Sequence, residues 1–204
     1  MRRFLLLVIL FTTGCAAWIQ TGGPYTSKSH NFSVELPQGW MRLNKDAYPG
    51  LSIYQRVMID SLLTFPNGDS YLCITRDGIP LQNIIINRQS IDDEFGHTKR
   101  KLSKDMLSQE AAEVILDNIS SDQSVFNLEV LENIPTEISG FSGFRLVFTY
   151  KNEDGLRTKS IFYGFMKDEW FYCIGYNSAA RHYFEKDLET FKEVLKSFKV
   201  TESV

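Results

Sequence analysis

One short motif places a serine where nucleophilic chemistry could use it. Residues 140–143 read Gly-Phe-Ser-Gly and match the first part of the G-x-S-x-G nucleophile elbow, in which the serine occupies a sharp turn between a strand and a helix. However, Phe144 stands where that motif has its second glycine, and a strand-like run follows Ser142 instead of preceding it. We therefore expect residues 140–143 to form a turn that has no nucleophilic function.

The other residues suited to acid–base or metal chemistry are scattered along the chain. His30, His97 and His182 have no cysteine or carboxylate at the spacings typical of metal ligands. Residues 92–94, Asp-Asp-Glu, form the densest acidic cluster. Glycoside hydrolysis needs two carboxylates across a cleft, whereas adjacent carboxylates usually share a solvated surface or a helix start. The sequence therefore predicts no catalytic residue, no metal site and no cofactor.

The first residues of the chain have the three regions of a secretion signal. Arginines at positions 2 and 3 precede an apolar run over residues 4–11, and small residues follow. The apolar run is too short to cross a hydrocarbon core, which needs about 20 residues in a helix. We expect a signal peptide over residues 1–14.

The end of this signal carries the clearest chemical assignment in the sequence. Residues 12–15 read Thr-Thr-Gly-Cys and resemble the lipobox of bacterial lipoproteins, whose cysteine is diacylated and becomes the new N-terminus. The resemblance implies that Cys15 is lipidated and that its acyl chains hold the protein at a membrane. Thr12 departs from the aliphatic residue that is usual three places before the cysteine. Ordinary secretion, with cleavage after Ala16 or Ala17, is the alternative.

Two further cysteines, Cys73 and Cys173, lie in apolar, strand-like runs. Export makes a disulfide between them chemically possible, but a bridge requires Cα atoms within about 7 Å of each other. Free cysteine is among the most buried residue types. We expect two buried free thiols, with a disulfide as the alternative.

The charges of the chain are nearly balanced, with 22 lysines and arginines against 25 acidic residues. This balance offers no broad basic field to a polyanion, so nucleic acid is not an expected partner. The one basic run contains Lys99, Arg100, Lys101 and Lys104. We interpret it as a solvated face at a helix start. Contact with anionic lipid head groups, worth about 1 kcal/mol per residue near the surface, is the alternative.

Length and composition predict a single folded domain. The 204 residues are 43% hydrophobic and 13% aromatic, which is typical of a globular domain and too apolar for a disordered chain. Residues 16–29 contain glycine, proline and several hydroxyl residues and lack an apolar period. We therefore divide the remaining chain into a lipidated cysteine with a flexible tether (15–29) and one globular domain (30–204).

The first part of the domain is predicted to consist of strands. Residues 32–36 alternate apolar and polar, as a half-buried strand does. Residues 51–59 and 71–75 are further strand candidates, separated by a Pro-Asn-Gly-Asp turn signal at 66–69. Residues 79–88 include three consecutive isoleucines, but a proline and polar neighbours make their faces hard to assign. We expect this segment to be an edge or connecting strand.

Two segments have the period of amphipathic helices. In the first, Ser103 is a suitable N-cap residue. The closing segment carries charged residues opposite its apolar stripe. The apolar stripes are Met106, Leu107, Ala111, Val114, Ile115 and Ile119 in the first helix, and Phe184, Leu188, Phe191, Leu195 and Phe198 in the second.

Between these helices the sequence returns to strand-like patterns. Residues 126–133 alternate, and runs at 144–150, 161–166 and 170–176 are joined by short connectors, which predicts an antiparallel meander. Strands and helices in this order predict an α+β fold, an antiparallel sheet flanked by amphipathic helices.

The two ends of this domain resemble the PsbP-like superfamily. Residues 32–40 read Phe-Ser-Val-Glu-Leu-Pro-Gln-Gly-Trp, and residues 170–176 read Trp-Phe-Tyr-Cys-Ile-Gly-Tyr and lead through two alanines to a helix that ends at 195–199, Leu-Lys-Ser-Phe-Lys. The resemblance covers nearly the whole mature chain and implies an α/β/α sandwich. The superfamily includes the extrinsic photosystem II subunit, a Ran-binding import factor and many bacterial lipoproteins of unassigned role. The resemblance implies that the protein binds or supports other proteins, and it includes no catalytic motif.

Aromatic residues gather near the end of the chain and leave a second function open. Strand alternation places Trp170, Tyr172 and Tyr176 on one face, and Phe171 and Cys173 on the other. Core packing explains most of them, but one set could line a groove for an apolar molecule.

The sequence therefore predicts an envelope lipoprotein that faces the periplasm or the cell exterior. We expect a membrane-anchored, non-catalytic module that interacts with or supports an unidentified protein partner. A carrier or sensor of a small apolar ligand is the alternative, and an enzyme is the third hypothesis.

Overall fold

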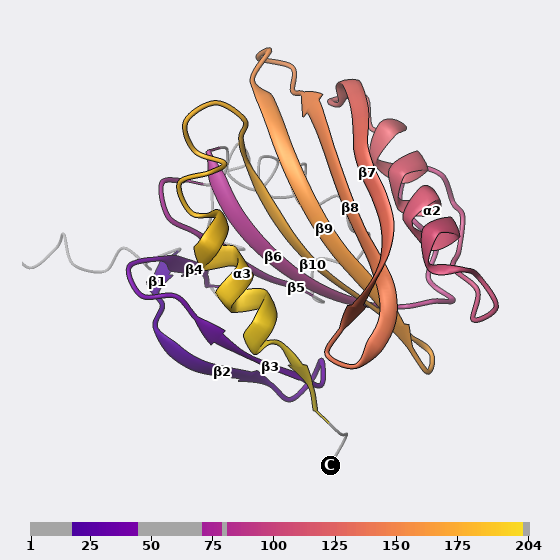
Figure 1. Ribbon diagram of the computed structural model, residues 1–204, viewed down its shortest axis with the longest axis horizontal. Helices are drawn as coiled ribbons and strands as arrows, with labels where there is room; N and C mark the ends of the chain where they lie inside the picture. The colour runs from indigo at the N-terminus through magenta and orange to yellow at the C-terminus, as the bar shows by residue number, and fades with distance from the viewer. Residues whose placement is uncertain (1–17, 45–70, 79–80, 202–204) are drawn as a thin grey trace, which may run out of the picture.

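The computed structural model of the protein describes residues 18–44, 71–78 and 81–201 (Figure 1). The expected signal peptide, Cys15, the strand candidate at 51–59 and the turn signal after it lie outside the described residues. In the described part of the chain, no helix has the length and apolarity needed to cross a membrane.

Eight of the eleven described strands form one antiparallel sheet. In spatial order its strands are β1 (Trp18–Gln20), β4 (Met41–Leu43), β5 (Tyr71–Thr75), β6 (Gln82–Ser90), β10 (Trp170–Ala179), β9 (Arg157–Lys167), β8 (Phe141–Lys151) and β7 (Phe126–Ile138). The last four strands follow one another both in sequence and in space, so the expected meander is confirmed.

The position of strand β6 in the sheet differs from the expected one. The isoleucine-rich segment is neither an edge nor a connecting strand, because β6 lies inside the sheet between β5 and β10. Residues 82–89 are all buried, the polar ones included. A strand covered on both faces is apolar without alternation, so the isoleucine run indicates an interior strand. Among the described residues, Asn177 donates a hydrogen bond to Asn83 of β6, whereas the buried side-chain amides of Asn87 and Gln89 have no hydrogen-bond partner.

Each face of the large sheet packs against a hydrophobic layer. Helix α2 (Ser108–Ser120) lies on one face, over β7, β8 and β9 (Figure 1). Helix α3 (Leu188–Ser197) and a separate three-stranded sheet cover the other face. The strands of the small sheet are β2 (Gly23–Ser27), β3 (Phe32–Leu36) and β11 (Lys199–Val200).

Part of the segment that was expected to be a tether forms strands. We expected residues 15–29 to be flexible, but β1 and β2 lie within that range and pair with β4 and β3. β3 has the expected alternation, with Phe32, Val34 and Leu36 buried. β11 pairs with β3 on its other side and so joins the two ends of the domain.

Helix α2 begins later than expected. Ser108 is its first residue, and the carboxylate of Glu110 accepts a hydrogen bond from the backbone N–H of Leu107 at 2.8 Å. Ser103 is not the N-cap, because its backbone carbonyl and hydroxyl close a local turn with the N–H groups of Met106 and Asp105. Leu107 is consequently 66% exposed and does not join the apolar stripe.

The expected closing helix is present as α3, and it is shorter than its apolar stripe. Phe191 and Val194 are buried, whereas Leu188 and Leu195 are only partly buried. Phe184 and Phe198 are buried as expected, but they lie just before and just after the helix.

Candidate functional site

The serine motif forms a hairpin turn and not a nucleophile elbow. Ser139 and Gly140 have φ values of 51° and 84° and join Ile138 of β7 to Phe141 of β8. Positive φ at both central residues is typical of a type I′ turn. Ser142 lies in β8, is exposed and pairs with Glu137 in the sheet. The turn is therefore displaced by one or two residues from the expected position.

Gly143 of this motif has a packing function that can be tested. A Cβ atom at this position would lie 2.3 Å from the carbonyl oxygen of Gly164 and 2.9 Å from Cβ of Phe165. We expect Gly143→Ala to destabilise the protein by about 1–3 kcal/mol through overpacking. Ser142→Ala should change stability by less than about 0.5 kcal/mol, because the side chain is exposed. Urea denaturation of both variants checks this, and equal midpoints would contradict it.

We expected the three histidines to lie apart from other reactive side chains, and the structure agrees with this only in part. Nε2 of His97 lies 3.6 Å from a carboxylate oxygen of Asp122, and the Ser124 hydroxyl donates to the other oxygen at 2.8 Å. The carboxylate thus stands between the imidazole and the hydroxyl, whereas nucleophilic activation requires the base to contact the hydroxyl. His182 is exposed, and His30 contacts two serine hydroxyls.

The described residues contain no group of three or more histidine, cysteine, aspartate and glutamate side chains that could hold a metal ion. Cys73 and Cys173 are free and fully buried, as expected. Burial raises the pKa of the Cys73 thiol to about 12 and also raises the pKa of the Cys173 thiol. Both groups therefore stay protonated at neutral pH, and a protonated thiol is a poor nucleophile.

The aromatic sets on β10 do not line a groove. Tyr172 and Tyr176 are buried in the core beneath α3, and Phe171 and Cys173 are buried in the core beneath α2. Trp170 is 37% exposed, and the guanidinium of Arg88 lies 3.5 Å from the centroid of its ring.

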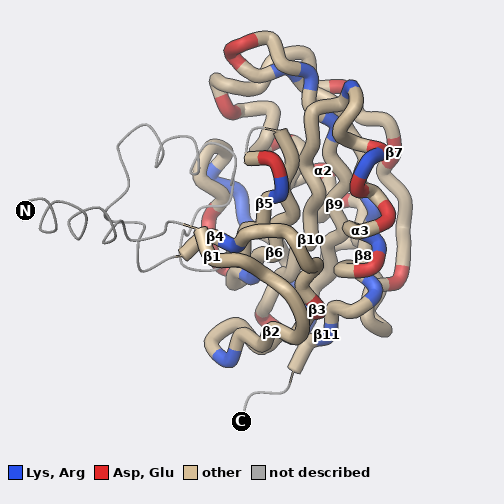
Figure 2. The backbone as a smooth tube through the Cα atoms, turned by 90° about the vertical axis from the view of Figure 1, so that its left-hand side faces the viewer, with Lys and Arg blue, Asp and Glu red and all other residues tan. Residues whose placement is uncertain are grey.

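The basic run is also placed differently from the expectation. Lys99, Arg100, Lys101 and Lys104 are exposed in the loop before α2, and not at a helix start. Arg100 pairs with Asp117 of α2. Along the described part of the chain, acidic and basic segments alternate in the view of Figure 2.

Exposed apolar side chains gather on β7. This strand lies at one edge of the large sheet, and among the described strands only β8 pairs with it. Of the seven exposed large hydrophobic residues in the described chain, four belong to β7 and are 44–48% exposed. We call this set the β7 edge; it consists of Phe126, Val130, Leu131 and Ile134.

Strand β7 is irregular, and two of its glutamates form ion pairs. Its register with β8 shifts twice, so that Leu131 lies in a bulge. Glu129 pairs with Arg157 at 3.1 Å, and Glu132 pairs with Arg145. Bulges limit uncontrolled pairing of an edge strand. The remaining exposed surface of the strand is largely apolar.

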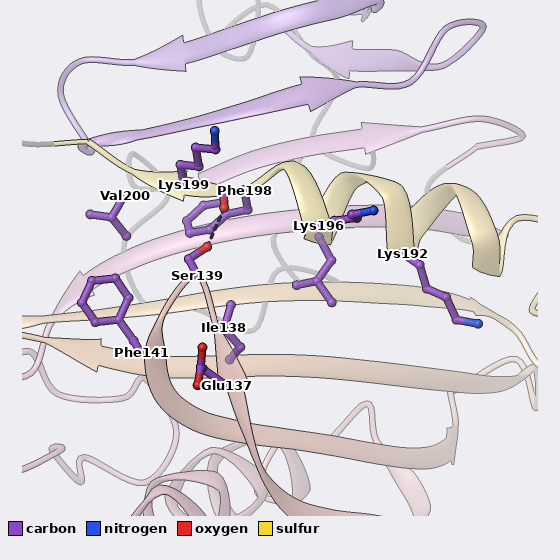
Figure 3. Close-up of a pocket in the computed structure, with 10 residues that line it drawn as sticks. Glu137, Ile138, Ser139, Phe141, Lys192, Lys196, Phe198, Lys199 and Val200 are labelled. Atoms are coloured by element: carbon purple, nitrogen blue, oxygen red, sulfur yellow. Dashed lines mark hydrogen bonds between the residues drawn. The ribbon is translucent and has the colours of Figure 1, made fainter.

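A pocket of about 700 Å³ lies on the α3 side of the molecule (Figure 3). The segments that form it are the β7–β8 turn, the second half of α3 and β11. We call it the α3–β11 pocket; its lining residues are Glu137, Ile138, Ser139, Phe141, Lys192, Leu195, Lys196, Phe198, Lys199 and Val200.

Helical spacing explains why α3 contributes both apolar and basic residues to this pocket. Leu195 and Lys196 follow Lys192 by three and four positions, and they therefore lie next to it on the helix surface. The β7–β8 turn supplies the opposite wall, and the 50 residues between Phe141 and Lys192 gave no sequence signal that the two segments meet.

Comparisons with known proteins bear on the fold. No protein-family model matches the chain, and no curated protein matches it. Among solved structures, cyanobacterial PsbP (CyanoP) from Synechocystis sp. PCC 6803 is similar with a TM-score of 0.55 at 14% identity, covering 89% of this chain and 94% of that chain. The chain has a PsbP-like fold.

A mutant of the protein Mog1 shares this PsbP-like fold, with a TM-score of 0.51 at 10% identity, covering 91% of this chain and 97% of that chain. Sequence identities this low show the fold alone, and one fold can support many functions. The basis for a functional proposal is therefore the β7 edge and the α3–β11 pocket of this chain.

Proposed function

We propose that the protein is an envelope lipoprotein, anchored through lipid on Cys15, whose domain binds a partner protein through the β7 edge. In this proposal the two amphipathic helices flank the sheet as a rigid α/β/α support. The domain acts without catalysis, on the periplasmic or outer side of a membrane.

The observation that carries this proposal is the concentration of exposed apolar side chains on an edge strand. Contiguous exposed apolar surface typically marks interaction sites. An edge strand also offers backbone N–H and C=O groups to an extended segment of a partner, which can add to the sheet. Because Glu129 and Glu132 are already paired with arginines, we expect the partner segment to be apolar rather than basic.

The test compares matched substitutions at the two edges of the large sheet. Ile134 on β7 is 44% exposed, and Ile19 on the opposite edge strand β1 is 36% exposed. We expect Ile134→Ser to lower the recovery of the partner about tenfold in affinity purification from membranes of the host, since interface hot spots contribute about 1–2 kcal/mol or more. Ile19→Ser should leave recovery unchanged.

The readout is quantitative mass spectrometry of the co-purified proteins. A protein enriched with the wild type and with Ile19→Ser, and depleted with Ile134→Ser, supports the proposal. Val130→Lys should give the same depletion, because a charge on the edge opposes strand addition. Identical profiles for all variants would contradict a role of the β7 edge.

A second candidate function is favoured by the α3–β11 pocket. Its volume of about 700 Å³ lies within the range of about 300–1,000 Å³ that is typical of small-molecule sites. The protein would then carry or sense a small apolar ligand, and this function is independent of the β7 edge.

A further inference from the structure

We infer that the α3–β11 pocket binds a single-chain amphiphile with a carboxylate head group, with its acyl chain on the apolar floor and its carboxylate at the lysine rim. This inference rests on the second candidate function and names the ligand class. Its basis is the separation of apolar and charged groups within the pocket.

The floor of the pocket is apolar and fixed by the core. Ile138 and Phe198 line it and are only 4% and 1% exposed. Phe141 stacks on buried Phe165, with ring centroids 5.2 Å apart. Leu195 is partly buried and packs against the same core. Such a surface favours an alkyl chain, because the apolar surface of both is removed from water and no buried polar group is left without a partner.

The rim of the pocket is predominantly basic. Three lysines and one glutamate line it. Lys192 pairs with Glu189 at 2.6 Å, whereas Lys196 and Lys199 make no ion pair with any described residue. Figure 3 shows that the side chains of Lys192 and Lys199 extend in different directions from the floor of the pocket. Their two ammonium groups therefore do not interrupt the apolar surface. Long lysine side chains can cover apolar surface while their charge stays in water. The rim therefore complements an anionic head group.

The walls of the pocket are held in place before any ligand binds. Ser139, in its positive-φ conformation, donates a side-chain hydrogen bond to the carbonyl of Phe198 (Figure 3). β11 is fixed by pairing of Lys199 and Val200 with β3. A pre-organised pocket pays little ordering entropy on binding.

The test uses the full chain carrying Cys15→Ser, which has no acyl chain of its own. Calorimetric titration with dodecanoate should show saturable binding. In the double variant Lys196→Gln/Lys199→Gln we expect the dissociation constant to rise about fivefold, as loss of two exposed charge contacts implies. The matched control Lys101→Gln/Lys151→Gln removes two exposed lysines outside the pocket and should bind as the parent does.

Two further measurements locate the site and separate the possible outcomes. Val200→Trp should fill the pocket and abolish binding, with retained folding checked by circular dichroism. 1-Dodecanol should bind the parent and the lysine variant equally. If dodecanoate and 1-dodecanol bind alike in every variant, the carboxylate assignment is wrong and the ligand-binding function remains. If neither dodecanoate nor 1-dodecanol binds the parent, the carboxylate assignment and the ligand-binding function are both wrong. Lysine-dependent sedimentation with phosphatidylglycerol vesicles, without dodecanoate binding, would replace this inference by contact with a membrane surface.

Discussion

Cys15→Ser is expected to move the protein from the membrane fraction to the soluble fraction, or to leave it as an unprocessed precursor. Cys15 is the only cysteine near the end of the expected signal, so its thiol is the only acceptor for lipid there. Each buried CH₂ group of an acyl chain contributes about 0.8 kcal/mol to membrane binding, and two chains suffice for stable anchoring. Their loss should therefore be close to all-or-none in fractionation of the cells.

Incorporation of labelled palmitate provides the direct measurement. The wild type should be labelled and Cys15→Ser should not. Thr12→Leu serves as a control, because it supplies the aliphatic residue that the lipobox resemblance lacks at this position and should retain the label. Absence of label in the wild type would disprove lipidation and would leave ordinary secretion as the explanation of the signal.

Phe191→Ala should produce a large loss of stability. Phe191 is 1% exposed, and its ring lies 5.4 Å from that of Tyr176 and 6.1 Å from that of Tyr163. Truncation of a buried phenylalanine typically costs about 3–5 kcal/mol. For a domain of this size the melting temperature should fall on the order of 10 °C. Thermal unfolding followed by circular dichroism measures the change.

Lys192→Ala is the neighbouring control, because Lys192 is exposed and its pairing with Glu189 lies on the surface. An exposed ion pair contributes about 0.2–1 kcal/mol, so the melting temperature should change little. If Phe191→Ala does not fold, Phe191→Leu retains most of the side-chain volume and should give a smaller measurable loss. Equal melting temperatures for the phenylalanine and lysine variants would contradict the docking of α3.

The sequence predicted those elements whose signals are local. The runs of β8, β9 and β10 are strand-like and are joined by short connectors, and strands joined in this way pair with each other. The closing helix was predicted from its period, and the burial of Cys73 and Cys173 from their apolar neighbours. The resemblance of the two ends of the domain to PsbP-like proteins agreed with the observed fold.

The predicted start of α2 and the predicted place of β6 were wrong for different reasons, the first local and the second tertiary. Ser103 has the residue type of an N-cap, but its backbone carbonyl closes a turn and the helix starts at Ser108. The isoleucines of β6 belong to an interior strand because β5 and β10 cover both of its edges. Pairing with β10 joins segments that are more than 80 residues apart, and a local pattern cannot encode it.

The sequence by itself determined the meander and the closing helix, because each depends on the order of neighbouring residues, and it carries the prediction of an export signal with its cysteine. Only the tertiary structure decided that β7 is an exposed edge, since alternation on a strand does not show which partners flank it. The α3–β11 pocket also depends on long-range contacts, as between Ser139 and Phe198. The residues that line this pocket are brought together by packing of distant segments, so their spacing in the chain does not reveal the pocket.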